Sequence, residues 1–363
     1  MKSITHDLQE NFDNLIEAED VLLLDVRTPS EYNYGHIPGA INLPLFTDEE
    51  RAAVGTTYKQ KGREAAIHAG LDFVGPRLSS IAAQAQELIN QNSGKHKLLL
   101  YCWRGGMRSA SVAWLLNLYG LNPQVIPGGY KAFRRWVINT FEEKYAFAVL
   151  GGFTGSGKTL LLNALKNRGF PVVDLEALAN HHGSAFGSLG QPQQPTQEHF
   201  ENMLALALRR ADIISKRTAF PIWIEDESRF IGRVFIPPAL WKQKIDAPLY
   251  ILPDLREIRI KNLVHNYGKS DLSELSACIL KIRKRLGPER AGLALFELGK
   301  GNISRAAEII LEYYDKTYQH SLGRRTGPTP VFLHEMCFDT TAALEYLSSI
   351  KLNTATINEN IPN

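Results

Sequence analysis

The first candidate for a reactive site is a cysteine that lies among glycines and arginines, in Tyr101–Ser109 (YCWRGGMRS). Cys102 follows the apolar run Lys97–Tyr101 and precedes a segment with helical spacing. Gly105 and Gly106 allow the chain to curl, so that consecutive backbone N–H groups can face inward as an anion nest. We therefore expect Cys102 to lie between a strand and a helix, in a loop that binds anions.

Arg104 and Arg108 add positive charge to the same loop. Together with the positive end of the following helix, they favour the thiolate of Cys102, which is the reactive form of a cysteine. Arg108 stands six positions after Cys102, which also matches the Cys-x5-Arg spacing of cysteine phosphatases and predicts a wide loop. We predict that Cys102, Arg104 and Arg108 are catalytic, and both chalcogen transfer and phosphoester chemistry stay open.

The second candidate site is Gly152–Thr159 (GFTGSGKT), which fits the G-x-x-x-x-G-K-[ST] phosphate-binding pattern. An apolar run precedes it and helical spacing follows it, as the pattern requires. Backbone amides can wrap a phosphate, Lys158 supplies a point charge, and the Thr159 hydroxyl can bind Mg²⁺. The expected phosphate-binding residues are Gly152, Thr154, Gly155, Ser156, Gly157, Lys158 and Thr159. The pattern does not distinguish a nucleotide from another diphosphate.

Three consecutive carboxylates, Glu225, Asp226 and Glu227, follow the apolar run Pro221–Ile224. In P-loop folds, a carboxylate at the end of a neighbouring strand usually faces the ligand. We expect one of the three to bind Mg²⁺ or to orient a water that acts as general base. An exposed acidic turn is the alternative.

Short apolar runs alternate with segments of helical spacing along most of the chain. The runs read as strands are Val21–Val26, Lys97–Tyr101, Gln124–Ile126, Phe147–Leu150, Val172–Asp174 and Pro221–Ile224. The segments read as helices are 109–119, 131–144, 159–167 and 198–215, and the pattern is mostly helical from 254 to about 350. This alternation predicts an α/β fold with parallel sheets.

The length of 363 residues is sufficient for two domains of ordinary size. We place a first domain at 1–140, a P-loop domain with a helical C-terminal part at 141–350, and a flexible polar tail at 351–363. No signal peptide and no apolar stretch of membrane-span length is seen, which favours a cytoplasmic protein without a membrane partner.

The net charge of +3 does not by itself indicate a nucleic-acid-binding protein. Basic residues are concentrated between positions 51 and 135 and again at 281–285, an asymmetry that could steer a polyanion to one face. The three cysteines, Cys102, Cys278 and Cys337, follow no metal-ligand spacing. Free thiols in a reducing compartment are the natural interpretation, with Cys278 and Cys337 inert.

The segment before the cysteine loop resembles the N-terminal signature of rhodanese domains. Asp25-Val26-Arg27, Glu31-Tyr32 and Gly35–Asn42 (GHIPGAIN) carry this resemblance, which covers about residues 10–140 when the Cys102 loop is included. It implies a rhodanese-like fold and a cysteine that carries sulfur or selenium as a persulfide-type adduct. In that signature the residues corresponding to Asp25, Arg27 and His36 are more often structural than catalytic.

The two halves together resemble the tRNA 2-selenouridine synthase family over about residues 10–330. The likeness is carried by residues 54–61 (VGTTYKQK), 101–109 (YCWRGGMRS), 128–133 (GGYKAF), 151–159 (GGFTGSGKT), 174–176 (DLE), 183–187 (GSAFG) and 224–231 (IEDESRFI). Two positions depart from the family pattern, which has glycine where this chain has Ala177 and arginine where it has His182.

The resemblance implies a transferase that converts wobble 2-thiouridine in tRNA to 2-selenouridine. The base is first S-geranylated from geranyl diphosphate, and selenium from selenophosphate then replaces the geranylthio group. The P-loop would hold the diphosphate, with Mg²⁺ as a further ligand, and Cys102 would handle the chalcogen. The alternative is a sulfurtransferase or cysteine phosphatase module fused to an NTP-dependent kinase-like domain that acts on a small molecule. Neither interpretation implies an oligomeric state.

Contact with tRNA is expected at the two basic stretches, Arg51–Arg77 and Lys281–Arg285. RNA-modifying proteins commonly hold an unpaired base by stacking it on an aromatic ring. Tyr58, Trp103 and Tyr130 are the aromatic residues near basic ones that could do so.

Overall fold

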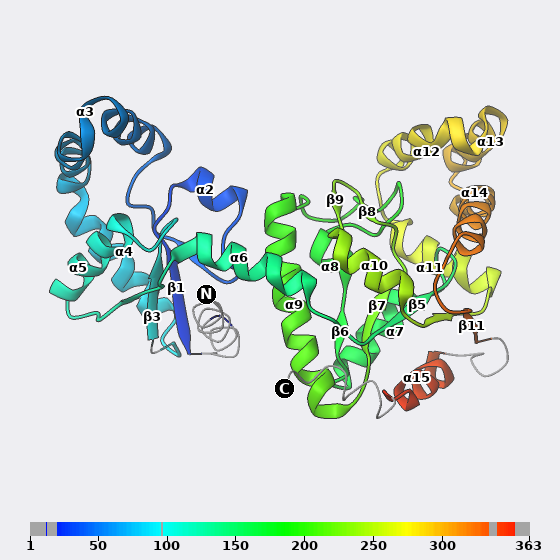
Figure 1. Cartoon of the computed structure of the whole chain (residues 1–363). Helices are drawn as coiled ribbons and strands as arrows, with labels where there is room; N and C mark the ends of the chain where they lie inside the picture. The colour runs from blue at the N-terminus through cyan, green and yellow to red at the C-terminus, as the bar shows by residue number, and fades with distance from the viewer. Residues whose placement is uncertain (1–11, 13–19, 96, 334–339, 353–363) are drawn as a thin grey trace. The chain divides into compact units, whose positions relative to one another are not determined.

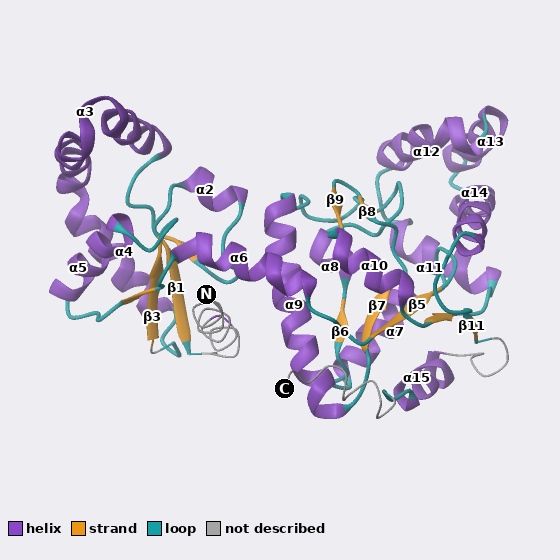
Figure 2. Cartoon of the chain, viewed as in Figure 1, coloured by secondary structure: helices purple, strands orange, loops and turns teal. Residues whose placement is uncertain are grey.

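The computed structural model describes residues 12, 20–95, 97–333 and 340–352. The chain forms two compact units, Met1–Thr140 with Glu201–Leu206, and Phe141–Phe200 with Ala207–Asn363. Each unit combines parallel strands with helices (Figures 1 and 2), so the predicted α/β class is confirmed. Cys337 and residues 353–363 of the expected tail lie outside the described residues.

The first unit is built on a four-stranded parallel sheet in the order β2-β1-β3-β4. Its strands are β1 (Val21–Asp25), β2 (Ile41–Asn42), β3 (Lys97–Tyr101) and β4 (Gln124–Val125). Its helices are α2 (Pro29–Tyr34), α3 (Asp48–Val74), α4 (Leu78–Gln91), α5 (Met107–Leu118) and α6 (Gly129–Glu142), with a short 3₁₀ turn, η1 (Gly75–Arg77). Asp25 lies opposite Tyr101, so β1 and β3 end at the same edge of the sheet.

The core of this unit forms where the sheet packs against α4 and α5. Leu24 and Leu100 on the strands are fully buried, and they belong to the same hydrophobic cluster as Ala82 on α4 and Val112 on α5. Helix α3 contains the 54–61 segment and bends at Gly62, whose φ of 87° is one that glycine adopts without steric cost.

The second unit is built on a five-stranded parallel sheet in the order β11-β10-β5-β7-β6, together with a two-stranded antiparallel ribbon. The sheet strands are β5 (Phe147–Gly151), β6 (Val172–Val173), β7 (Ile222–Glu225), β10 (Leu249–Ile251) and β11 (Val331–Phe332), and the ribbon is β8 (Phe230–Ile231) with β9 (Val234–Phe235). The glycine loop follows β5, which lies between β10 and β7.

The helices of the second unit include a group at its C-terminal end that forms a hydrophobic core of its own. They are α7 (Lys158–Asn167), α8 (Leu175–Ala179), α9 (Gln197–Thr218), α10 (Pro238–Asp246), α11 (Arg256–Tyr267), α12 (Leu272–Leu286), α13 (Pro288–Gly299), α14 (Ile303–Gly323) and α15 (Thr340–Ser349). Ile279 of α12, Ala294 of α13 and Ile309 of α14 are buried together. Among the described helices, none is long and apolar enough to cross a membrane.

Candidate functional site

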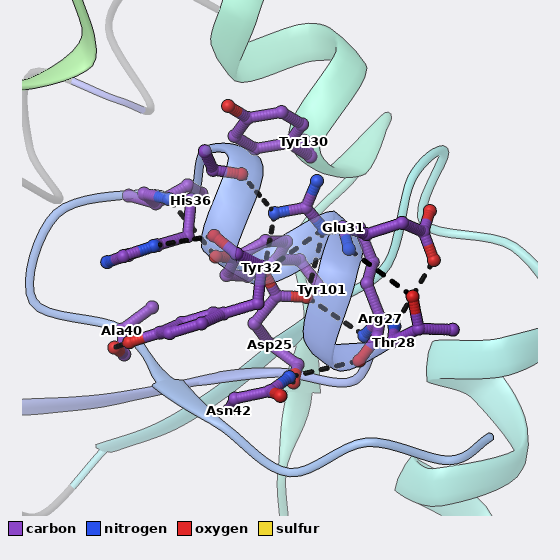
Figure 3. Close-up of polar contacts among 12 residues, drawn as sticks. Asp25, Arg27, Thr28, Glu31, Tyr32, His36, Ala40, Asn42, Tyr101 and Tyr130 are labelled. Atoms are coloured by element: carbon purple, nitrogen blue, oxygen red, sulfur yellow. Dashed lines mark hydrogen bonds and ion pairs between the residues drawn. The ribbon is translucent and has the colours of Figure 1, made fainter. Parts of the chain in front are cut away.

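A buried ion pair lies where β1 ends (Figure 3). The Arg27 guanidinium donates to the Asp25 carboxylate at 2.6 Å, and both side chains are at most 1% exposed. The same guanidinium lies 3.8 Å from the centre of the Tyr130 ring and donates to the carbonyl of Gly35 at 2.7 Å. These contacts join β1 to the segment around Gly35 and to the start of α6, in agreement with the structural role expected for Asp25 and Arg27.

His36 is held against α2 (Figure 3). Its ring stacks on the Tyr32 ring with 3.8 Å between the centroids, and its Nδ1 lies 2.9 Å from the Tyr32 carbonyl oxygen. Burial lowers the pKa of His36, which favours the neutral imidazole. His36 therefore also has a structural position.

Cys102 follows β3 directly and is 4% exposed. The loop that carries it packs against the start of α6, where the Tyr130 N–H donates to the Cys102 carbonyl at 2.9 Å. This packing requires a glycine at position 129, because its φ is +55° and a Cβ there would collide with the Cys102 carbonyl. The 128–133 segment thus fixes the path of the cysteine loop.

The loop stabilises the thiolate of Cys102. Burial raises the pKa of Cys102, but hydrogen bonds from the Ser109 hydroxyl and from the backbone amides of Ser109, Arg104 and Gly106 outweigh it, and the pKa is lowered. The Ser109 Oγ lies 3.3 Å from the sulfur. In contrast, burial raises the pKa of Cys278. Cys102 is therefore the more reactive of the two thiols in the described part of the chain.

The two arginines of the loop have different surroundings. Arg104 is exposed, and its backbone amide faces the sulfur. Arg108 forms two hydrogen bonds to the Glu31 carboxylate, at 2.6 and 3.2 Å, and these lower the pKa of Glu31 against the effect of burial. Glu31 also caps α2 through Thr28. Sequence reasoning missed the contribution of Ser109 and the pairing of Arg108 with Glu31.

The P-loop connects β5 to α7, as the pattern predicts. Gly152, Gly155 and Gly157 have positive φ, and a Cβ on Gly155 would lie 2.8 Å from the Arg259 carbonyl oxygen. Lys158 starts α7 and donates to the Gly152 carbonyl at 2.9 Å. The Ser156 hydroxyl is buried and has no hydrogen-bond partner among the described residues. A phosphate oxygen in the loop would supply that partner.

Two helices of the C-terminal part hold the P-loop from outside. Arg259 of α11 is buried, donates to the Thr154 carbonyl at 2.9 Å and pairs with Asp254 and with Asp315 of α14. Asn262, one turn further on α11, donates to the Gly155 carbonyl at 2.8 Å. These long-range contacts hold the loop in place, and the sequence pattern of the loop does not predict them.

The three consecutive carboxylates have three different environments. Glu225 is fully buried at the end of β7 and accepts a hydrogen bond from the Thr159 hydroxyl at 3.1 Å. Asp226 pairs with Lys244 at 3.0 Å and accepts from the Tyr318 hydroxyl at 3.1 Å. Burial raises the pKa of Glu227 to about 7, with a further contribution from the charge of nearby Glu176.

Glu176 is a fourth carboxylate of this site, from the first turn of α8. Its Oε2 lies 3.3 Å from the Thr159 hydroxyl and 2.9 Å from Nδ1 of His182. The hydrogen bond to Glu176 raises the pKa of His182, so this imidazole is more readily protonated than a free one. His182 therefore lies against Glu176 at the position where the family pattern has arginine.

The residues around Thr159 fit a magnesium ion. Within 20–95, 97–333 and 340–352, no three histidine, cysteine, aspartate or glutamate side chains gather as a metal site. Magnesium commonly uses only one or two carboxylates together with phosphate oxygens and water. The Thr159 hydroxyl with Glu225 and Glu176 offers such a set of oxygens beside the phosphate loop.

A large hollow of about 1110 Å³ lies in the first unit between α3 and α5. Its lining includes Arg51, Tyr58, Lys59, Arg63 and Arg108, among mostly apolar residues. Tyr58 is 58% exposed, which leaves its ring accessible to a nucleobase.

The other positions expected to contact tRNA differ in accessibility. Trp103 is 39% exposed, but Tyr130 is fully buried, so the expectation that Tyr130 stacks a base is wrong. The Tyr130 ring packs against the Arg27 guanidinium, and its hydroxyl accepts a hydrogen bond from the Asn202 side-chain amide at 2.8 Å. The second basic stretch is exposed on α12, at Lys281, Arg283, Lys284 and Arg285.

Comparison with known proteins matches both units. Residues 145–337 match the family described as tRNA 2-selenouridine synthase AAA domain, and residues 8–135 match the rhodanese-like domain. The tRNA 2-selenouridine synthase of Marinobacter nauticus is 37% identical over 341 residues, which cover 85% of this chain and 90% of that protein. The one of Bdellovibrio bacteriovorus is 35% identical over 367 residues, with coverages of 90% and 94%. The chain belongs to the tRNA 2-selenouridine synthase family.

Proposed function

We propose that this chain converts wobble 2-thiouridine of tRNA to 2-selenouridine, through S-geranylation from geranyl diphosphate and then selenium exchange from selenophosphate. The observation that carries the proposal is the presence in one chain of a thiolate-stabilising loop at Cys102 and a P-loop with a buried, unpartnered Ser156 hydroxyl. The product in this proposal is taken from the relatives, which are named tRNA 2-selenouridine synthase.

In the first step, the sulfur of 2-thiouridine attacks C1 of the geranyl group. The C1–O bond breaks, its electron pair leaves with the diphosphate, and the proton on N3 of the base is released. The P-loop amides, Lys158 and the Ser156 hydroxyl would hold the diphosphate and stabilise the charge that develops on it. Mg²⁺ bound at Thr159, Glu225 and Glu176 would neutralise part of the same charge.

Glu227 is the carboxylate that suits the proton transfer of this step. Burial raises the pKa of Glu227 above that of a free carboxylate, which favours proton acceptance near neutral pH. Asp226 is a poor candidate, because its ion pairs with Lys244 and Arg325 lower its pKa against the effect of burial. The three neighbouring carboxylates would thus divide into a metal ligand, a general base and a structural anion.

In the second step, selenium bonds to C2 of the base and the geranylthiolate leaves. Water takes the phosphoryl group of selenophosphate as orthophosphate. The nest around Cys102 would bind the selenophosphate anion, and the Cys102 thiolate would accept the proton that the water loses as it takes the phosphoryl group.

The tRNA would contact the hollow between α3 and α5. Arg51, Lys59 and Arg63 line it and can neutralise backbone phosphates, and Tyr58 can stack on a splayed base. The proposal is tested by incubating the full chain with 2-thiouridine tRNA and geranyl diphosphate, without selenophosphate. Geranylated nucleoside should accumulate. Its absence, together with turnover of ATP or of a phosphoester without tRNA, would instead favour the kinase-like or phosphatase alternative.

A further inference from the structure

The hollow between α3 and α5 of the first unit has a lining that contact with RNA phosphates does not explain. Apart from four basic residues and a few hydroxyl groups, its described lining consists of apolar side chains and glycines. Leu71, Met107 and Trp114 are part of this lining, and each is more than half exposed. Large apolar side chains that gather at an exposed concave surface mark a binding site. The hollow is therefore suited to a ligand with an apolar part.

The bend of α3 places both of its halves around the hollow. The helix changes direction at Gly62, and the lining includes Tyr58 before the bend and Leu71 after it. Gly55 and Gly70 belong to the lining as well and contribute no side chain to fill the space. The volume of about 1110 Å³ lies just above the range of about 300–1,000 Å³ that is typical of small-molecule sites. It has room for a nucleobase that carries a large substituent.

The hollow reaches the cysteine loop. The backbone amide of Gly106 donates to the Cys102 sulfur, and the next two residues, Met107 and Arg108, line the hollow. Trp114, about two turns further along α5, lines it as well. A substituent on a base that reacts at Cys102 can therefore extend along α5 over the apolar lining.

The charged residues of the hollow have one sign. Arg51, Lys59 and Arg63 are exposed on α3, and none of the described lining residues is acidic. Positive side chains around a concave surface attract a polyanion such as RNA. An uncharged lipid or an apolar protein segment would gain nothing from them. The combination of basic and apolar residues fits a ligand that is anionic in one part and apolar in another.

We propose that the hollow binds the geranyl group of the S-geranylated base before selenium replaces it, an inference that rests on the proposed function. In this intermediate a hydrocarbon chain is attached to an anionic RNA. The chain gains free energy by leaving water for the apolar lining, and the basic residues of α3 neutralise phosphates of the same RNA. Unmodified 2-thiouridine lacks the chain and uses only the basic part of the surface. The hollow thus selects the geranylated RNA for the second step.

The test compares two anticodon stem-loop RNAs that differ only in the geranyl group, one with S-geranyl-2-thiouridine at the wobble position and one with 2-thiouridine. Leu71→Gln and Trp114→Gln each place a polar group in the lining at an exposed position, which preserves the fold. The matched control is Leu118→Gln, an exposed leucine one turn after Trp114 that is not part of the lining. Fluorescence anisotropy measures binding of both RNAs to each full-length protein.

We expect the wild type and Leu118→Gln to bind the geranylated RNA about tenfold or more tightly than the 2-thiouridine RNA. In Leu71→Gln and Trp114→Gln this preference should fall below about threefold, while binding of the 2-thiouridine RNA stays within about twofold of wild type. Lys59→Gln should weaken binding of both RNAs by a similar factor, because its contact is with phosphates that both contain.

The outcomes separate the hollow from the proposed function once selenophosphate is added to the geranylated RNA and the nucleosides are weighed. If the wild type forms 2-selenouridine but Leu71→Gln and Trp114→Gln keep its preference, or the wild type has none, the geranyl group lies elsewhere. The hollow assignment is then overturned, while the proposed function stands. A wild-type dimer that Leu71→Gln dissociates in sedimentation would show that a second copy covers the hollow, with the same consequence. If the wild type forms no 2-selenouridine, the proposed function fails, and the hollow assignment fails with it.

Discussion

Replacing Ser109 with alanine should raise the pKa of Cys102 by about one unit. The Ser109 hydroxyl lies 3.3 Å from the sulfur and 3.1 Å from the Gly106 carbonyl oxygen, so its single proton is available to the thiolate but shared with that carbonyl. Hydrogen bonds to charged groups contribute about 1.5–3 kcal/mol. We take the lower end because sulfur is a weak acceptor and the proton is shared. One pKa unit corresponds to about 1.4 kcal/mol.

The assay is the pH dependence of iodoacetamide alkylation, followed by the mass of the peptide that contains Cys102. The midpoint should move up by about one unit in Ser109→Ala, with a similar plateau rate at high pH. Ser111→Ala is the matched control, because Ser111 lies on the exposed side of the same helix. An unchanged or lower midpoint in Ser109→Ala would show that the backbone amides alone set the pKa, contrary to this reasoning.

Three further predictions concern the charged groups of the two units. Asp25→Asn leaves Arg27 buried without its counter-ion and should lower the free energy of unfolding in urea by about 3–5 kcal/mol; a loss below about 1 kcal/mol would contradict the structural role of the pair. Because the pKa of Glu227 is raised to about 7, its contribution to stability is present at low pH and is lost as pH rises from about 4.5 through 7. Glu227→Gln should therefore gain thermal stability relative to wild type at pH 8 but not at pH 4, and equal differences at both pH values would refute the assignment. Thr159→Ala should remove most of the enhancement that Mg²⁺ gives to pyrophosphate binding in calorimetry, whereas an unaltered enhancement would place the metal elsewhere.

The positions of both chemical loops were predictable because local rules determine them. A glycine-rich segment between an apolar run and a helical segment must turn at the end of a strand, which holds for Cys102 and for Lys158 alike. Glu225 is the last residue of β7 and faces Thr159, whereas Asp226 follows the strand and pairs with Lys244.

The remaining features depend on contacts between residues far apart in the sequence. Glu176 reaches Thr159 from the start of α8, and Arg259 reaches Thr154 from α11, so neither could be assigned from spacing. Tyr130 follows two glycines and lies near basic residues in the sequence, but packing against Arg27 buries its ring. Secondary-structure propensities and sequence motifs do not predict such packing, because it forms only when segments far apart in the sequence come together.

The central claim is that two sites in one chain act in succession on one tRNA base. It is tested most directly by incubating wild type, Lys158→Ala and Cys102→Ser with 2-thiouridine tRNA, geranyl diphosphate and selenophosphate, and weighing the nucleosides. Wild type should yield 2-selenouridine, Lys158→Ala should leave 2-thiouridine unchanged, and Cys102→Ser should accumulate the geranylated nucleoside. Formation of 2-selenouridine by Cys102→Ser at the wild-type rate, or normal geranylation by Lys158→Ala, would contradict the account.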